Sequence, residues 1–230
     1  HQLLRPLSGK IKVALPYLFF RNGPLSMSLN QGGGFVKSDP ALNVPDLQLY
    51  FSPLSYSTAP YGRRPLMMPD PYPAVRLGFS LCKPTSEGSI SIQSADSSVP
   101  PKLFGNYLST RYDQQTMISG MKLMRKLAAT EALKKIVHTE MSPGKDVKSD
   151  AELLEYARLH GETVFHQCGT CRMGDNPANS VVDGKLKVRG VYGLRVADAS
   201  IFPTIPSGNI NAPSIMVGEK AAELILQENK

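Results

Sequence analysis

The spacing of apolar residues changes along the chain, and this change limits the possible folds more than any other feature. Between positions 47 and 93 apolar side chains recur at every second residue, whereas between positions 117 and 159 they recur at every third or fourth residue. The first spacing is typical of strands with one buried face, and the second is typical of helices. The sequence therefore predicts a mixed α+β chain.

The alternating segments predict strands in the first hundred residues. Apolar and polar side chains alternate over residues 47–51, over residues 75–82 and again over residues 89–93. A turn-forming sequence with Pro and Gly separates the last two segments, which predicts an antiparallel hairpin. We expect Ile90 and Ile92 on the inner face of that hairpin.

Two glycine- or proline-rich segments are expected to lack regular structure. The run Gly32-Gly33-Gly34 follows no predicted strand and lacks the GxGxxG spacing, so a flexible loop is expected rather than a phosphate-binding turn. Residues 52–73 are rich in Pro, Tyr and Ser. A loop of this length predicts either the wall of a binding site, which would include Tyr56 and Tyr61, or a surface excursion.

Helical spacing and capping signals predict several helices. Ser149 and Glu152 form a capping box, which marks the beginning of one of them, and Pro213 after Asn211 marks the beginning of another. The helices are expected in the first twenty residues, from near Asp113 to Ala128, over Thr130–His138, from Ser149 to Leu159 and from Asn211 onward. Short strands are expected between them at 181–183, 186–188 and 193–198.

Composition narrows the class of protein. The 230 residues carry a net charge of +7, but the Lys and Arg residues are scattered and form no patch with interleaved aromatics, which argues against nucleic-acid binding. Three cysteines do not form a disulfide framework, so we expect a reducing, cytoplasmic location. No apolar run is long enough for a transmembrane helix. The chain begins with His1 rather than Met, which indicates a processed product or a fragment.

The densest group of chemically active residues lies between His166 and Gly174. Three interpretations are open: a zinc site built on His166, Cys168 and Cys171, a Cys-x-x-Cys redox pair, or a lone histidine that acts as a general base. A fourth zinc ligand is not evident nearby, and the segment is not followed by the helix that a redox pair requires. The other histidines have no supporting context.

The sequence around this group resembles the C-terminal part of the glucose–methanol–choline oxidoreductases. The resemblance rests on His166-x-x-Gly-Thr-Cys-x-Met-Gly, on the run Leu186–Ser200, and on the closing run Ser207-Gly-Asn-Ile-Asn-Ala-Pro213. It continues more weakly through Cys82–Pro84, Ser94–Asp96 and Asn106–Leu108. The resemblance implies an antiparallel-sheet substrate domain backed by helices, followed by the C-terminal return of a Rossmann-like FAD domain. The N-terminal dinucleotide-binding half would be missing, because no GxGxxG follows a strand.

The same resemblance implies an activity and a set of site residues. Residues 1–24 would form a lid or linker, residues 25–165 the substrate-binding domain, and residues 166–230 the active-site segment and part of the FAD domain. The reaction would be oxidation of a small primary alcohol to an aldehyde, with hydride passing to the flavin N5 of FAD. His166 would be the general base and Asn209 its orienting partner. The residues implied to contact the cofactor are Asp198, Ala199, Asn211 and Ala212, and no metal is implied.

Two further expectations concern the cysteines and a competing function. Cys168 and Cys171 are interpreted as packing residues near the flavin rather than redox partners. The alternative to catalysis is a non-catalytic truncated fragment that needs a missing FAD-binding half. A flavin absorbance spectrum of the purified chain would discriminate between the two. The sequence leaves open which alcohol is oxidised and which electron acceptor is used.

Overall fold

The structure is a computed structural model that describes residues 2–57 and 68–228. The chain divides into two compact units, and each unit is built from two separate segments of sequence. Unit 1 comprises residues 1–80 and 119–148, and unit 2 comprises residues 81–118 and 149–230. Both units mix helices with short strands, which confirms the predicted mixture of helix and antiparallel sheet.

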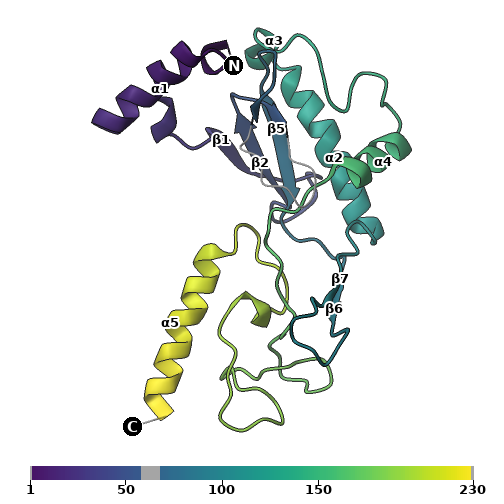
Figure 1. The fold of residues 1–230 in the computed structure, drawn as a ribbon. Coiled ribbons are helices and arrows are strands. Elements are labelled where there is room, and N and C mark those ends of the chain that lie inside the picture. The colour runs from purple at the N-terminus through teal and green to yellow at the C-terminus, as the bar shows by residue number, and fades with distance from the viewer. Residues whose placement is uncertain (1, 58–67, 229–230) are drawn as a thin grey trace. The chain divides into compact units, whose positions relative to one another are not determined.

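Unit 1 is built around a three-stranded sheet with the order β1-β2-β5 (Figure 1). Its strands are β1 (Gly32–Val36), β2 (Leu47–Ser52) and β5 (Arg76–Leu81). The strands predicted at 47–51 and 75–82 are therefore confirmed. The prediction of a flexible loop at the three glycines was wrong, because they begin β1 and pair antiparallel with β2. A Cβ atom on Gly33 would lie 2.3 Å from the Leu49 carbonyl oxygen, so only glycine allows this close approach.

The predicted hairpin between residues 75–82 and 89–93 is also wrong. The first of these segments, β5, lies next to β2, whereas β6 (Ser89–Ser91) pairs antiparallel with β7 (Lys102–Phe104). Ile90 and Ile92 do not face inward, since their exposed fractions are 50% and 89%. Alternation indicates that a strand has two faces, but it does not identify the strand beside it.

Helix α2 (Arg111–Ala128) confirms the predicted methionine-rich helix. In unit 1 its second half packs on the sheet at Gly120, where an added Cβ would come within 2.2 Å of the Phe79 ring. Helix α3 (Glu131–Lys134) is shorter than predicted, because the β-branched Ile136 and Val137 that follow it favour a helix less. The remaining elements of unit 1 are η1 (Gln2–Leu4), α1 (Leu7–Phe20), η2 (Pro24–Ser26), β3 (Tyr56–Ser57) and β4 (Met68–Pro69).

Between the sheet and the helices of unit 1 lies an apolar cavity of about 410 Å³. Its walls include Leu49 and Leu77 from the sheet, Met124 and Leu127 from α2, and Leu133 from α3. No titratable side chain lines it except the phenol of Tyr50 among the described residues. The cavity therefore offers no acid–base group suited to alcohol oxidation.

Unit 2 contains the predicted capped helix and the closing helix. The capping box is confirmed, because Ser149 Oγ accepts from the Glu152 N–H and the Glu152 carboxylate accepts from the Ser149 N–H at the beginning of α4 (Asp150–His160). Helix α5 (Asn211–Glu228) begins where predicted. The strands predicted between 181 and 198 were wrong: only isolated bridges form there, at Met173–Val182, Val182–Val188 and Lys187–Arg195.

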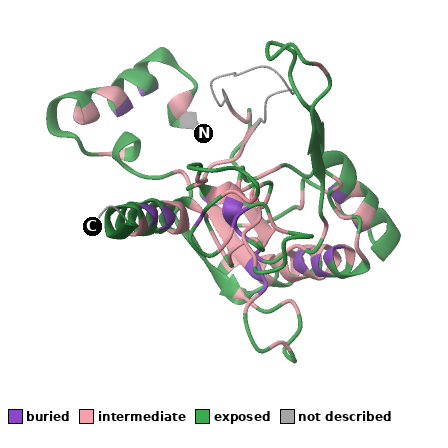
Figure 2. Cartoon of the chain, turned by 90° about the horizontal axis from the view of Figure 1, so that it is seen from below, coloured by how far each residue is buried: buried purple, intermediate pink, exposed green. Residues whose placement is uncertain are grey.

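The core of unit 2 lies under this irregular chain. It consists of buried residues from the loop, from the short helix η3 (Ala199–Ile201) and its end, and from α5 (Figure 2): Val182, Leu186, Ile201, Phe202, Val217 and Ala221. Cys168 and Met173 pack against this cluster. The segment that carries His166 is therefore held by apolar packing although it has almost no regular secondary structure. Within residues 2–57 and 68–228 we find no helix long and apolar enough to cross a membrane.

Candidate active site

The side chains of His166 and Asn209 meet in unit 2, although 43 residues separate them in sequence. Asn209 Nδ2 lies 2.9 Å from His166 Nε2. The amide N–H can only donate, so Nε2 is the acceptor of this contact in the tautomer whose ring proton is on Nδ1. His166 is half-buried and Asn209 is exposed, so a small ligand can reach both side chains.

The backbone around His166 explains how the imidazole is presented. Phe165, the preceding residue, has a φ of 59°, a left-handed conformation that is rare for a bulky side chain. Beyond His166 the chain runs beside η3, where the amides of Cys171 and Met173 donate to the carbonyls of Ser200 and Ile201, each at 2.8 Å. The segment is consequently fixed on the C-terminal side of the histidine.

Gly169 is required where this segment turns. Its φ is 84°, and a Cβ atom there would lie 3.2 Å from the Phe202 carbonyl oxygen. Both the backbone angle and the close approach favour glycine. The glycine of the His-x-x-Gly pattern therefore lets the chain fold back onto η3 immediately after the histidine.

A turn and a helix hold Asn209 from its two sides. The Gly208 N–H donates to the Pro206 carbonyl at 2.8 Å, and the Ser214 N–H donates to the Ile210 carbonyl at 2.9 Å in the first turn of α5. Asn209 lies between these two bonds, two positions before the helix begins. The backbone is therefore restrained on both sides of Asn209.

Asn211 and Ala212 occupy the first two positions of α5, and both are exposed. The first amides of a helix have no partner inside the helix, and the helix dipole favours an anion at this end. Pro213 contributes no N–H, and the first turn contains no acidic residue. Free amides at this end of α5 suit a group that carries negative charge, and contact of these two residues with a cofactor stays a prediction.

Asp198 and Ala199 lie at η3 rather than at the end of a strand, which corrects the expected local structure. The Asp198 carboxylate accepts from the Ser200 N–H at 2.8 Å, and its contacts with Ser200 lower the pKa of Asp198 below its usual value. The Ala199 carbonyl accepts from the Gly169 N–H at 3.4 Å, which places it beside the histidine segment. Ser200 Oγ is buried in the described parts of the chain, and its side chain contributes to the lowered pKa of Asp198.

The two cysteines near His166 are free thiols and half-buried. Burial raises the pKa of the Cys168 thiol, and the Arg172 guanidinium opposes that increase only in part. A raised pKa disfavours the thiolate that redox exchange and metal binding both need. Over the described ranges, no three His, Cys, Asp or Glu side chains are arranged to hold a metal ion.

The tyrosine-rich loop expected as a pocket wall is only partly described. Tyr56 belongs to β3, and the Arg76 guanidinium lies 5.1 Å from the centre of its ring. Tyr61 lies outside the described residues. The role of this loop as a wall of the substrate site stays a prediction.

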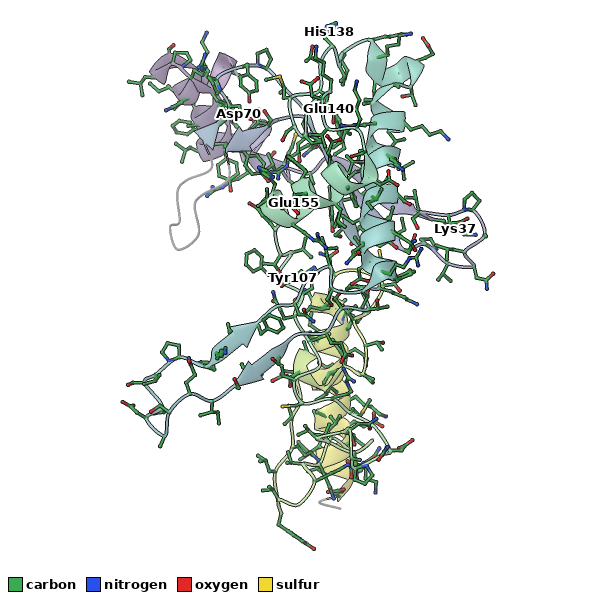
Figure 3. The ribbon with its side chains drawn as sticks, turned by 90° about the vertical axis from the view of Figure 1, so that its right-hand side faces the viewer. Lys37, Asp70, Tyr107, His138, Glu140 and Glu155 are labelled. Atoms are coloured by element: carbon green, nitrogen blue, oxygen red, sulfur yellow. The ribbon has the colours of Figure 1, made fainter. Side chains whose placement is uncertain are left out.

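Sequence reasoning missed two polar contacts of the histidine segment (residues 166–174) and one buried carboxylate. Arg172 forms an ion pair with Glu87 at 2.7 Å, and Gln167 Nε2 lies 3.4 Å from the hydroxyl of Tyr107, which is labelled in Figure 3. Asp113, interpreted only as the beginning of a helix, is buried and accepts bonds from Thr85. No local pattern identifies partners that lie 28 to 85 residues apart.

Several known proteins are similar to this chain in sequence or in structure. The sequence profile of "GMC oxidoreductase" matches residues 84–218. The chain is 41% identical to alcohol dehydrogenase [acceptor] of Pseudomonas putida over 216 residues, which are 92% of this chain and 37% of that protein. It is 35% identical to the mitochondrial choline dehydrogenase of Mus musculus, over 98% of this chain and 37% of that protein. A crystal structure of formate oxidase superposes with a TM-score of 0.83 at 27% identity, covering 98% of this chain and 43% of that one.

Proposed function

The chain belongs to the GMC oxidoreductase family, and from this premise we propose that it carries the catalytic histidine of an FAD-dependent enzyme that oxidises a small primary alcohol to an aldehyde. The chain spans a little over a third of the length of the curated relatives it matches. We therefore assign the reaction to the complete protein. The observation that supports the proposal most directly is the 2.9 Å contact between Asn209 and His166.

His166 would remove the hydroxyl proton of the alcohol. A neutral alcohol gives up hydride reluctantly, whereas an alkoxide does so readily, so a base within hydrogen-bond reach of the hydroxyl is needed. In the tautomer whose ring proton is on Nδ1, the Nε2 atom beside Asn209 has the lone pair that this step requires. An imidazole can accept the alcohol proton on one ring nitrogen and later release it, which suits a general base.

Asn209 would hold the same oxygen without taking its proton. A carboxamide does not titrate, but its N–H can donate to the alcohol oxygen. An alcohol that accepts from Nδ2 and donates to Nε2 would replace the direct contact between the two side chains. The pair thus supplies one donor and one acceptor to a single hydroxyl, which is the pattern that orients an alcohol for loss of its proton.

FAD, when bound, would supply the hydride acceptor. Asn211 and Ala212 would direct their amides and the positive end of α5 toward the negative charge of the cofactor, and Asp198 and Ala199 would line another part of its site. In this proposal residues 25–165 form the substrate domain, residues 1–24 a lid or linker, and the dinucleotide half of the FAD domain comes from elsewhere in the complete protein.

The base role is tested by His166→Ala in the complete, FAD-loaded protein. We expect the rate constant of flavin reduction by a primary alcohol to fall by about 10² to 10⁴-fold, the usual contribution of a general base. His138→Ala is the matched control, because His138 is exposed and belongs to unit 1. A loss smaller than about tenfold for His166→Ala would show that the histidine is not the base.

A further inference from the structure

We propose that Arg172 and Glu87 are positioning residues for His166, because their ion pair fastens the histidine segment to a loop that a buried carboxylate holds in place. This inference rests on the proposed function, since it assigns a role in the same reaction. Neither side chain would touch the substrate. Their contribution would be to keep the imidazole at hydrogen-bond distance from the alcohol.

The ion pair joins two segments that are far apart in sequence. Arg172 Nη2 lies 2.7 Å from Glu87 Oε1, across 85 residues. Arg172 stands between Cys171 and Met173, whose amides bond to η3. The backbone bonds hold one side of the segment against η3, and the arginine side chain attaches it to a second part of unit 2.

The loop that bears Glu87 is itself anchored on Asp113. The two carboxylate oxygens of Asp113 accept from the N–H groups of Thr85 and Ser86, each at 2.8 Å, and Oδ1 also accepts from the Thr85 hydroxyl at 3.0 Å. Asp113 is only 1% exposed. Burial raises the pKa of Asp113, but the hydrogen bonds from Ser86 and Thr85 outweigh burial and hold the pKa below its usual value.

Additional bonds restrict Glu87 within this loop. Asn106 Nδ2 donates to the Glu87 carbonyl at 2.8 Å, and the Ser109 N–H donates to Ser86 Oγ at 3.0 Å. Asn106 has a φ of 49°, so the backbone is left-handed at the residue that donates to the Glu87 carbonyl. An exposed carboxylate on such a restrained loop loses little conformational freedom when it pairs with an arginine.

A second contact attaches residues 85–110, the part of unit 2 that bears Glu87, to Gln167, the residue beside the histidine. Gln167 Nε2 lies 3.4 Å from the Tyr107 hydroxyl and 2.7 Å from Thr163 Oγ1. The histidine segment is therefore tied to residues 85–110 at two points, Gln167 and Arg172, with Gly169 as the turn between them. Because small displacements of a catalytic group reduce rates steeply, even an exposed ion pair at this position should influence the reaction.

The experiment uses the complete, FAD-loaded protein and its Glu87→Gln, Arg172→Gln and E87R/R172E variants. We expect each single variant to lower the rate constant of flavin reduction about five- to tenfold, with the KM within twofold, the FAD content unchanged and Tm unchanged. The charge-swapped variant should recover most of the lost rate, because it restores an ion pair between the same positions. Glu223→Gln is the control: it removes an exposed pair with Lys220 inside α5, and its rate should equal that of the wild type.

The dependence of the rate constant on ionic strength is a second readout. It should not change if Arg172 and Glu87 only stabilise the fold. At about 1 M salt the Debye length falls to about 3 Å, so an exposed pair is weakened. The wild-type rate should then fall toward that of Glu87→Gln, whose own rate should change little. If Arg172→Gln does not fold, Glu87→Gln alone decides the question.

Two outcomes would overturn the inference. One is wild-type activity in Glu87→Gln, and the other is a charge-swapped variant no faster than the single variants. These results are distinguishable from failure of the proposed function. If no primary alcohol reduces the flavin of the wild type, or if His166→Ala keeps its rate, the proposed function itself is wrong. An active wild type, an inactive His166→Ala and a fully active Glu87→Gln would reject only the positioning role.

Discussion

Different kinds of interaction hold the sheet region of unit 1 and the loop region of unit 2 (residues 161–210) in place. In the first, β1, β2 and β5 pair through backbone bonds, and α2 covers them with apolar side chains. In the second, residues 161–210 contain no strand longer than a bridge and only the short helix η3. The candidate catalytic pair belongs to the second region.

The difference shows how an irregular segment can hold catalytic groups in place. Regular elements obtain their order from repeated backbone bonds, so individual side chains matter less. The loop region depends instead on single features: Gly169 at its turn, the ion pair between Arg172 and Glu87, and, through the segment that bears Glu87, the buried carboxylate of Asp113 in α2. We therefore expect the loss of a polar side chain to lower stability or activity most in unit 2. Substitutions that add bulk at a glycine should be most informative about packing in unit 1.

The largest effect on stability is expected for Asp113→Ala. The change leaves the amides of Thr85 and Ser86 without the buried carboxylate that accepts from both, and each amide left unsatisfied costs about 1–3 kcal/mol. We expect the free energy of unfolding, measured by urea denaturation, to fall by about 3 kcal/mol. Asp96→Ala, which removes an exposed carboxylate bonded to the Ser98 N–H, should cost much less. Equal losses would contradict the anchoring role of Asp113.

The next effect concerns activity rather than stability. Asn209→Ala removes the amide that would orient the alcohol, and loss of one such donor typically lowers rates by about 10²-fold. We expect the rate constant of flavin reduction to fall by about that factor while Tm is maintained. Asn43→Ala in unit 1 serves as the control. An active Asn209→Ala enzyme would remove Asn209 from the proposed site.

A pair of neighbouring glycines tests the packing of unit 1. In Gly33→Ala the new methyl group would meet the Leu49 carbonyl, which is backbone and must move, so we expect a loss of about 1–2 kcal/mol. In Gly34→Ala the new methyl group meets no atom within 4 Å, so stability should be maintained. Thermal unfolding of the two variants side by side measures the difference. If both behave alike, the close approach of β1 to β2 is not required.

The smallest effect is a pH dependence at the end of α5. Lys187 and Arg195 lower the pKa of Glu228 from 4.5 to about 2. A carboxylate with a depressed pKa stabilises the folded state above its ordinary pKa, and this contribution is lost as the pH falls from about 4.5 toward 2. Because Glu228 is exposed, the change should be modest. Unfolding curves of wild type and Glu228→Gln should differ at pH 6 and converge near pH 2.

Local signals in the sequence predicted three of the helices well. The Ser149–Glu152 capping box, the methionine spacing of α2 and the Asn211–Pro213 signal each depend on residues within a few positions of one another. The pattern around His166 likewise identified the family, because its residues are contiguous. Among the residues implied for the site, His166 and Asn209 lie in contact in the structure. The roles of both stay predictions until the variants are measured.

Only the tertiary structure decided which segments meet. Whether β5 pairs with β2 or with β6, whether three glycines form a loop or a strand, and whether Arg172 finds Glu87 all depend on contacts between distant parts of the chain. Alternation and composition are the same in either outcome, so the sequence by itself determined the capped and regularly spaced helices and the pattern that identifies the family. Their partners were decided by long-range packing, which depends on shape and on buried hydrogen bonds that no local pattern records.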